Sequence, residues 1–308
     1  MIEWCAKFAD VAQLRKQSSF LASKLLGDIQ PGSLPLHAFE RKAMSALSAA
    51  FGNFARTRVR RVYLGSEFCS YLEMSAEEWA QGVELLNRWG FQATLVLGPQ
   101  TSRRIEQTLS VVADAARECL DKLEVVANDW GTLAALSDLD VEPILGRLLF
   151  KMKRSPRMGR ETLPVLPEGT NFVDRISAQQ MLALAQWPFS HSSSEKMLDS
   201  LKVRRVEMEM VPQGINPPAT PVACTLYAPF TYITGGGVCP VQRLTTVNEE
   251  TRCARRCRTS VIIPEFENAT WPLLQAGHTN FGRMTSVLKY YRERTFIDRW
   301  VFEPGIPM

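Results

Sequence analysis

Short apolar runs alternate with amphipathic stretches from residue 59 to the middle of the chain. Runs rich in β-branched and aliphatic residues, which predict strands, lie at residues 59–64, 92–97 and 123–127. Stretches with apolar residues at helical spacing lie at residues 76–89, 101–120 and 129–136. Ser75 and Glu78 form a capping box that starts the first helix. Strands separated by helices of this length indicate βαβ units and a mostly parallel sheet.

The rest of the chain adds further strand-like runs and one different segment. The further runs lie at residues 203–211, 260–263 and 300–302. With this many units in one chain, an α/β barrel is favoured over an open sheet. Residues 1–58 instead have a helical pattern over 6–26 and 36–55, with a Gly/Pro break between them. The sequence therefore predicts a helical N-terminal segment at 1–58 and an α/β barrel at 59–308.

Composition and charge narrow the class of protein only slightly. The chain has 308 residues, of which 45% are hydrophobic and 22% charged, as is usual for a globular protein. No apolar run approaches the ~18 residues of a membrane span, and the first residues lack the regions of a signal peptide. We therefore expect no membrane span and a cytoplasmic location. The formal net charge of +4 suits an anionic partner without requiring one.

The cysteines carry the strongest chemical signal. There are seven, an odd number that fits poorly with a disulfide framework, and thiols remain reduced in the cytoplasm. Cys239 is followed by a thirteen-residue gap to Cys253, and three residues separate Cys253 from Cys257. One helical turn would put the last two sulfurs on the same face. Clustered cysteines of this kind indicate a metal centre.

The fourth ligand has several candidates. Cys69 lies just past the first predicted strand, and the carboxyl ends of parallel strands converge on the site in such folds. Cys224 is its main rival, and Cys119 is more typical of a small core residue. An iron–sulfur cluster and a zinc ion are the two candidate metal centres. Structural zinc sites usually use paired C-x₂₋₄-C motifs, and only one short pair is present here, so the spacing favours iron. Inert thiols are a third interpretation.

Other residues are candidates for substrate chemistry. Asn128 and Asp129 follow a predicted strand, where they could face a substrate, although Asp129 is also a natural helix N-cap. His278 is the histidine that we expect to act in the site. A basic run that could bind a carboxylate or phosphate, or form a solvated loop, contains Arg147, Lys151, Lys153, Arg154 and Arg157. Aromatic residues do not interleave with these charges, so stacking platforms for RNA are not evident, and we expect no DNA partner.

Several blocks of the chain resemble the peptidase U32 family. They are VYLGSEFC (62–69), LEVVANDWGTLAAL (123–136), PILGRLLFKMKRSPR (143–157), FTYITGGGVCP (230–240), CARRC (253–257), AGHTNFG (276–282) and IDRWVFEP (297–304). The resemblance extends over residues 59–308 and leaves residues 1–58 without a counterpart. It looks closest to a less-studied bacterial branch of the family.

The resemblance implies a TIM-barrel-like fold and a [4Fe–4S] cluster. LGSEFC and the C-x₁₃-C-x₃-C spacing match the family's ligand pattern, which makes Cys69, Cys239, Cys253 and Cys257 the implied ligands. Characterised relatives act in oxygen-independent hydroxylation of the ubiquinone ring or of RNA nucleobases, and the ubiquinone-pathway members work as a pair of U32 proteins.

We therefore expect a redox or hydroxylation step on a small organic or nucleobase substrate, together with a second U32 protein. A non-catalytic iron–sulfur partner subunit, a U32 peptidase and a zinc-stapled interaction module are the alternatives. The sequence has no H-E-x-x-H or G-x-S-x-G motif that would favour a peptidase.

Overall fold

The computed structural model describes most of the chain. The described residues are 2–30, 37–154, 183–236, 238–245, 253, 255–258, 260–263, 273–283 and 287–306. Arg157, in the predicted basic run, lies outside them.

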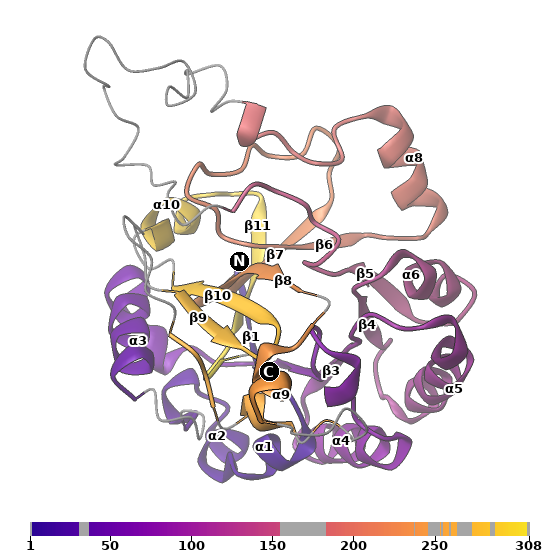
Figure 1. Cartoon of the computed structure of the whole chain (residues 1–308), viewed down its shortest axis with the longest axis horizontal. Helices are drawn as coiled ribbons and strands as arrows, with labels where there is room; N and C mark the ends of the chain where they lie inside the picture. The colour runs from indigo at the N-terminus through magenta and orange to yellow at the C-terminus, as the bar shows by residue number, and fades with distance from the viewer. Residues whose placement is uncertain are drawn as a thin grey trace.

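Eight parallel strands form a closed barrel (Figure 1), so the prediction of a TIM-barrel-like α/β fold is confirmed. Around the barrel the strand order is β1-β11-β7-β6-β5-β4-β3-β2. Their bounds are β1 Glu3–Phe8, β2 Arg61–Leu64, β3 Gln92–Val96, β4 Glu124–Ala127, β5 Glu142–Leu145, β6 Arg205–Met208, β7 Ala223–Ala228 and β11 Ile297–Phe302. Within the described residues, no helix is both long enough and apolar enough to cross a membrane.

The first strand corrects the prediction of a wholly helical N-terminal segment. β1 pairs in parallel with β11 on one side and with β2 on the other, so residues 3–8 close the barrel. Its side chains alternate: Trp4, Ala6 and Phe8 belong to the outer hydrophobic core, whereas Cys5 belongs to the cluster inside the barrel. This period of two is hidden in the sequence because Lys7, a residue usually solvated, also lies inside.

Helices cover the outside of the barrel strands, as βαβ connections require (Figure 1). The described helices are α1 Val11–Arg15, α2 Ser18–Ser23, α3 His37–Phe51, α4 Ala76–Arg88, α5 Ser102–Glu118, α6 Trp130–Leu136, α8 Ser192–Ser200, α9 Pro240–Thr245 and α10 Leu288–Arg292. The capping box before α4 is confirmed, because Ser75 Oγ accepts from the Glu78 N–H and Glu78 accepts from the Ser75 N–H. The run at 260–263 is not a barrel strand, since it makes only an isolated bridge from Ile262 to Gln275.

A small antiparallel sheet, absent from the sequence prediction, lies at one end of the barrel. It has the order β8-β10-β9, with bounds β8 Phe230–Gly235, β9 Leu273–Ala276 and β10 Thr279–Arg283. β8 starts two residues after the end of β7, so the sheet begins at the carboxyl end of the barrel strands. Figure 1 shows it in front of the barrel centre, close to α9. Active sites of parallel barrels lie at this end.

Candidate metal centre

Four cysteines come together at the carboxyl end of the barrel. Cys69 follows β2, Cys239 directly precedes α9, and Cys257 lies in a short 3-10 helix at Arg256–Arg258 that packs against α9. Cys257 is buried, and burial raises the pKa of its thiol to about 11. Charges on Cys69, Cys239 and Cys253 raise it further, so these three thiols lie near Cys257.

The rival fourth cysteines lie elsewhere. Cys224 is on β7, where its thiol donates to the Val222 carbonyl at 3.3 Å, and burial raises its pKa to about 12. The charges acting on Cys224 are those of Asp298 and Arg205, on neighbouring strands at the other end of the barrel. Cys5 is inside the barrel, and Cys119 is the C-cap of α5. Among the described cysteines, Cys69 is therefore the one that joins the 239–257 segment.

The chemistry of the donor set allows two kinds of metal centre. Iron–sulfur clusters are held by cysteine thiolates, and four thiolates also suit a tetrahedral zinc ion. Within the described residues, no group of three or more His, Cys, Asp or Glu side chains is arranged to hold a metal ion.

An apolar shell surrounds this site. Cys257 packs in one hydrophobic cluster with Phe68, Phe230 and Phe281, and Cys69 borders it. Phe68 stacks on Tyr232 with a centroid separation of 5.2 Å. Such a shell limits the access of water and lowers the local dielectric around bound metal.

Backbone and histidine contacts fix the chain next to the thiols. His278, in the turn between β9 and β10, donates from Nε2 to the Phe68 carbonyl at 2.9 Å, so it lies beside Cys69. The Gln242 N–H donates to Cys239 Sγ at 3.4 Å. Gly98 lies directly against the Cys69 backbone, where an added Cβ would be 3.6 Å from the Cys69 carbonyl carbon and 3.2 Å from the Ser66 oxygen.

A buried group of charges, here called the mouth ionic cluster, lies next to the cysteines. Its members are Lys7, Glu67, Arg147, Glu207, Glu209 and Glu303. Arg147 binds Glu67 through Nε at 2.9 Å, contacts Glu209 at 3.2 Å and pairs with Glu303. Lys7 pairs with Glu67, and its Nζ lies 3.3 Å from Glu303 Oε1.

Burial shifts the protonation of this cluster. Removal from water lowers the pKa of Lys7 to about 7, with the charge of Arg147 as the next cause. Burial likewise raises the pKa of Glu207 and of Glu209 to about 7, although both lie near cations that oppose the shift. The cluster therefore holds several groups that can exchange protons near neutral pH.

Phe68 connects the mouth ionic cluster to the cysteines. The Arg147 guanidinium lies 4.9 Å from the Phe68 ring centroid, and Lys7 Nζ lies 5.6 Å from it. Phe68 and Cys69 are consecutive residues. The buried side chains of Arg147 and Lys7 therefore both lie beside the ring of the residue that precedes Cys69, a predicted metal ligand.

The residues of the predicted basic run differ in their burial. Arg147 and Arg154 are buried, so the interpretation of a solvated loop is wrong for both. Arg154 donates to the Phe150 carbonyl at 2.5 Å and to the Tyr232 carbonyl at 3.3 Å, which fastens the loop after β5 to β8. Lys151 is exposed, and partial burial lowers its pKa.

Asn128 and Asp129 are occupied by contacts within the protein. Asn128 donates to the Leu97 carbonyl at 2.9 Å and accepts from the Leu148 N–H at 3.2 Å. Asp129 is the N-cap of α6, as one of its two interpretations predicted, and accepts from the Thr132 N–H at 2.8 Å. Its other oxygen accepts from the Gln100 N–H at 2.9 Å. These contacts hold together the loops that follow β3, β4 and β5.

Sequence reasoning missed most of the mouth ionic cluster. The available signal was the alternation around β6, where Glu207 and Glu209 are two residues apart and face inward, between apolar residues that face outward. Nothing comparable marks Lys7, Glu67 or Glu303.

Compared with known proteins, the chain matches no family model, and no curated protein sequence matches it.

Proposed function

We propose that this chain holds a [4Fe–4S] cluster through Cys69, Cys239, Cys253 and Cys257. We further propose that it acts in an oxygen-independent hydroxylation or related redox step on a small organic or nucleobase substrate, as the resemblance to the peptidase U32 family implies. The observation that supports the proposal is the meeting of four thiols from two distant segments at the carboxyl end of the barrel. An all-cysteine donor set of this size is typical of such clusters.

When bound, a cluster with four thiolate ligands transfers single electrons. The chain's own residues would set the conditions for that transfer. The apolar shell around Phe68 and Cys257 excludes water, and the Gln242 N–H donates to one sulfur. Hydrogen bonds to sulfur, nearby charge and exclusion of solvent all tune the potential of such a site.

The mouth ionic cluster would supply protons and charge balance to the redox step. Glu207 and Glu209 have pKa values raised to about 7, so their carboxyl groups can gain or lose a proton at neutral pH. Arg147 holds a positive charge close to Phe68, and Lys7, whose pKa is lowered to about 7, can gain one there. Added negative charge at the neighbouring thiols would be balanced by Arg147 and by proton uptake.

The alternative is an iron–sulfur subunit that works only with a second protein of the same family. Three large apolar side chains that are close in sequence to the cysteines are exposed, namely Tyr71, Val238 and Ile263. A partner protein that binds over the site would cover such side chains. Size-exclusion chromatography after co-expression with its genomic neighbours tests this alternative, which requires a stable hetero-complex for any activity.

Anaerobic purification followed by metal analysis and absorbance spectroscopy tests the proposal. We expect about four irons and four acid-labile sulfides per chain, with a broad brown absorption that bleaches on reduction by dithionite. Zinc without visible absorption would support the zinc-stapled module instead. A protein that binds neither metal after anaerobic reconstitution would contradict the proposal.

A further inference from the structure

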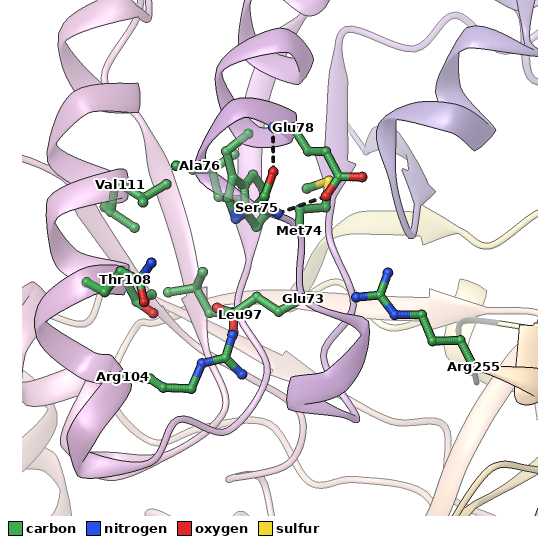
Figure 2. A pocket seen from close by; sticks show the side chains of 14 residues that line it. Glu73, Met74, Ser75, Ala76, Glu78, Leu97, Arg104, Thr108, Val111 and Arg255 are labelled. Atoms are coloured by element: carbon green, nitrogen blue, oxygen red, sulfur yellow. Dashed lines mark hydrogen bonds and ion pairs between the residues drawn. The ribbon is translucent and has the colours of Figure 1, made fainter. Parts of the chain in front are cut away.

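A cavity of about 310 Å³ lies between α4 and α5, beside the segment that carries Cys253 and Cys257 (Figure 2). This volume is at the lower end of small-molecule sites, which span about 300–1,000 Å³. Its apolar wall includes Trp79, Leu95, Leu97 and Val112. A cavity of this size and lining suits a compound with a single ring.

The polar side of the cavity holds a carboxylate that is only partly satisfied. Glu73 accepts from Gln100 at 2.9 Å through Oε1, and its Oε2 lies 3.0 Å from Arg104 Nη2. That Oε2 atom is buried and receives no hydrogen bond of good geometry. A ligand hydroxyl or N–H group could donate to it. Because Arg104 already neutralises the carboxylate, the site does not favour a cation.

Arg255 supplies positive charge that has no counterpart in the described part of the chain. Figure 2 shows its side chain directed toward the cavity from the side opposite Arg104. That side chain is exposed and makes no hydrogen bond or ion pair with any described residue. Its φ of 53° is in the left-handed region, which costs about 1 kcal/mol for a residue with a Cβ. Arg255 therefore lies at a strained backbone position between the two cysteines.

The other acid at the cavity does not cancel Arg255. Glu78 is held by the capping box, where it accepts from the Ser75 N–H at 2.8 Å. It also lies in the first turn of α4, where the helix dipole compensates negative charge. Glu73 is paired with Arg104 and Glu78 is committed to the helix start, so Arg255 is the charged side chain at this cavity that has no ion-pair partner among the described residues.

We propose that this cavity binds a small single-ring compound that bears one anionic oxygen and one hydrogen-bond donor. Arg255 binds the anionic oxygen, Glu73 accepts from the donor, and the ring packs on the wall around Trp79 and Leu97. Arg255 lies two residues from each cysteine of the pair, so the cavity adjoins the segment that carries them. The assignment of this ligand as the substrate rests on the proposed function, whereas the binding site itself does not.

Ligand-observed NMR and calorimetry on the anaerobically reconstituted full chain test this site. The probes are 3-hydroxybenzoate, its neutral amide 3-hydroxybenzamide, and benzoate, which lacks the donor. We expect 3-hydroxybenzoate to bind at least tenfold more tightly than the amide, since a charge-assisted hydrogen bond contributes about that much. Benzoate binds more weakly than 3-hydroxybenzoate, and Glu73→Gln reduces that difference.

Variants separate the cavity from the general charge of the protein. Arg255→Gln should weaken 3-hydroxybenzoate about tenfold, and Val111→Phe, which fills the cavity, should abolish binding. Arg243→Gln removes an exposed arginine that does not line the cavity and should bind as the parent protein does. Circular dichroism confirms that each variant is folded.

The outcomes distinguish this site from the proposed function. Equal binding of 3-hydroxybenzoate and its amide, or an unchanged affinity in Arg255→Gln, overturns the site. If a cluster forms and no probe binds, the site fails and the proposed function stands. If no cluster forms and 3-hydroxybenzoate still binds with dependence on Arg255, the proposed function fails and the site stands.

Discussion

Replacing Arg147 by methionine tests whether the mouth ionic cluster stabilises the barrel as a charged unit. Arg147 is fully buried and is the cation shared by Glu67, Glu209 and Glu303. Without it, those carboxylates stay buried with Lys7 as the remaining cation of the cluster. Removing one partner of a buried ionic pair costs about 3–5 kcal/mol. That is a large fraction of the ~5–15 kcal/mol by which domains are stable.

Urea unfolding followed by circular dichroism at pH 8 measures this loss. The matched control is Arg88→Met, which breaks an exposed pair with Glu84 on α4 and should cost under about 0.5 kcal/mol. Adding Glu209→Gln to Arg147→Met removes one uncompensated charge and should restore part of the stability.

The pH dependence of the Arg147→Met variant gives a second test. Loss of the cation raises the pKa of the buried carboxyl groups above their unfolded value, so they are protonated in the folded state at low pH. The stability that this proton uptake provides is present at pH 5 and is lost as the pH rises through the folded pKa. The deficit of Arg147→Met should therefore be smaller at pH 5 than at pH 8. A loss under about 1 kcal/mol that is equal at both pH values would refute the reasoning.

Two further predictions concern protonation and helix capping. Burial raises the pKa of Glu207 from 4.5 to about 7, so its contribution to stability falls as the pH rises through that window. Relative to Glu207→Gln, the parent protein should lose about 2 kcal/mol between pH 5 and pH 7.5 in urea titrations, and parallel profiles would contradict this. Ser75→Ala removes the side-chain cap of α4 and should lower the stability by about 0.5–2 kcal/mol, measured by thermal unfolding. The control Ser194→Ala, in the first turn of α8 but not at its N-cap position, should change the stability by under about 0.5 kcal/mol.

The parallel barrel could be predicted where local pattern and burial agree. From β2 to α6, apolar strands and amphipathic helices alternate, and Ser75 marks a helix start by local hydrogen bonding alone. β1 was missed because half of its residues face the barrel interior, where Lys7 is buried. A prediction that places polar residues on the outside cannot anticipate a buried lysine. The β8–β10 sheet was missed because β8 follows β7 so closely that the two strands form one apolar run in the sequence.

The candidate site was predictable to the extent that chain topology determines it. Cys69 was expected near the other cysteines because parallel strands place their carboxyl ends together, and it does lie near Cys257. The ionic partners of Arg147 come from β6 and from residues that follow β2 and β11, so they meet only when the barrel closes. No local spacing marks such a set, and Arg147 therefore looked like part of a solvated basic run.

The iron content of two matched cysteine variants tests the central claim most directly. After anaerobic reconstitution, Cys69→Ala should lose most of its iron and its visible absorption, because one of four ligands is gone. Cys224→Ala should keep both at the level of the parent protein, since that thiol lies on β7 in contact with Val222. Full iron in Cys69→Ala, or loss of iron in Cys224→Ala with the fold intact, would contradict the assignment of the four ligands.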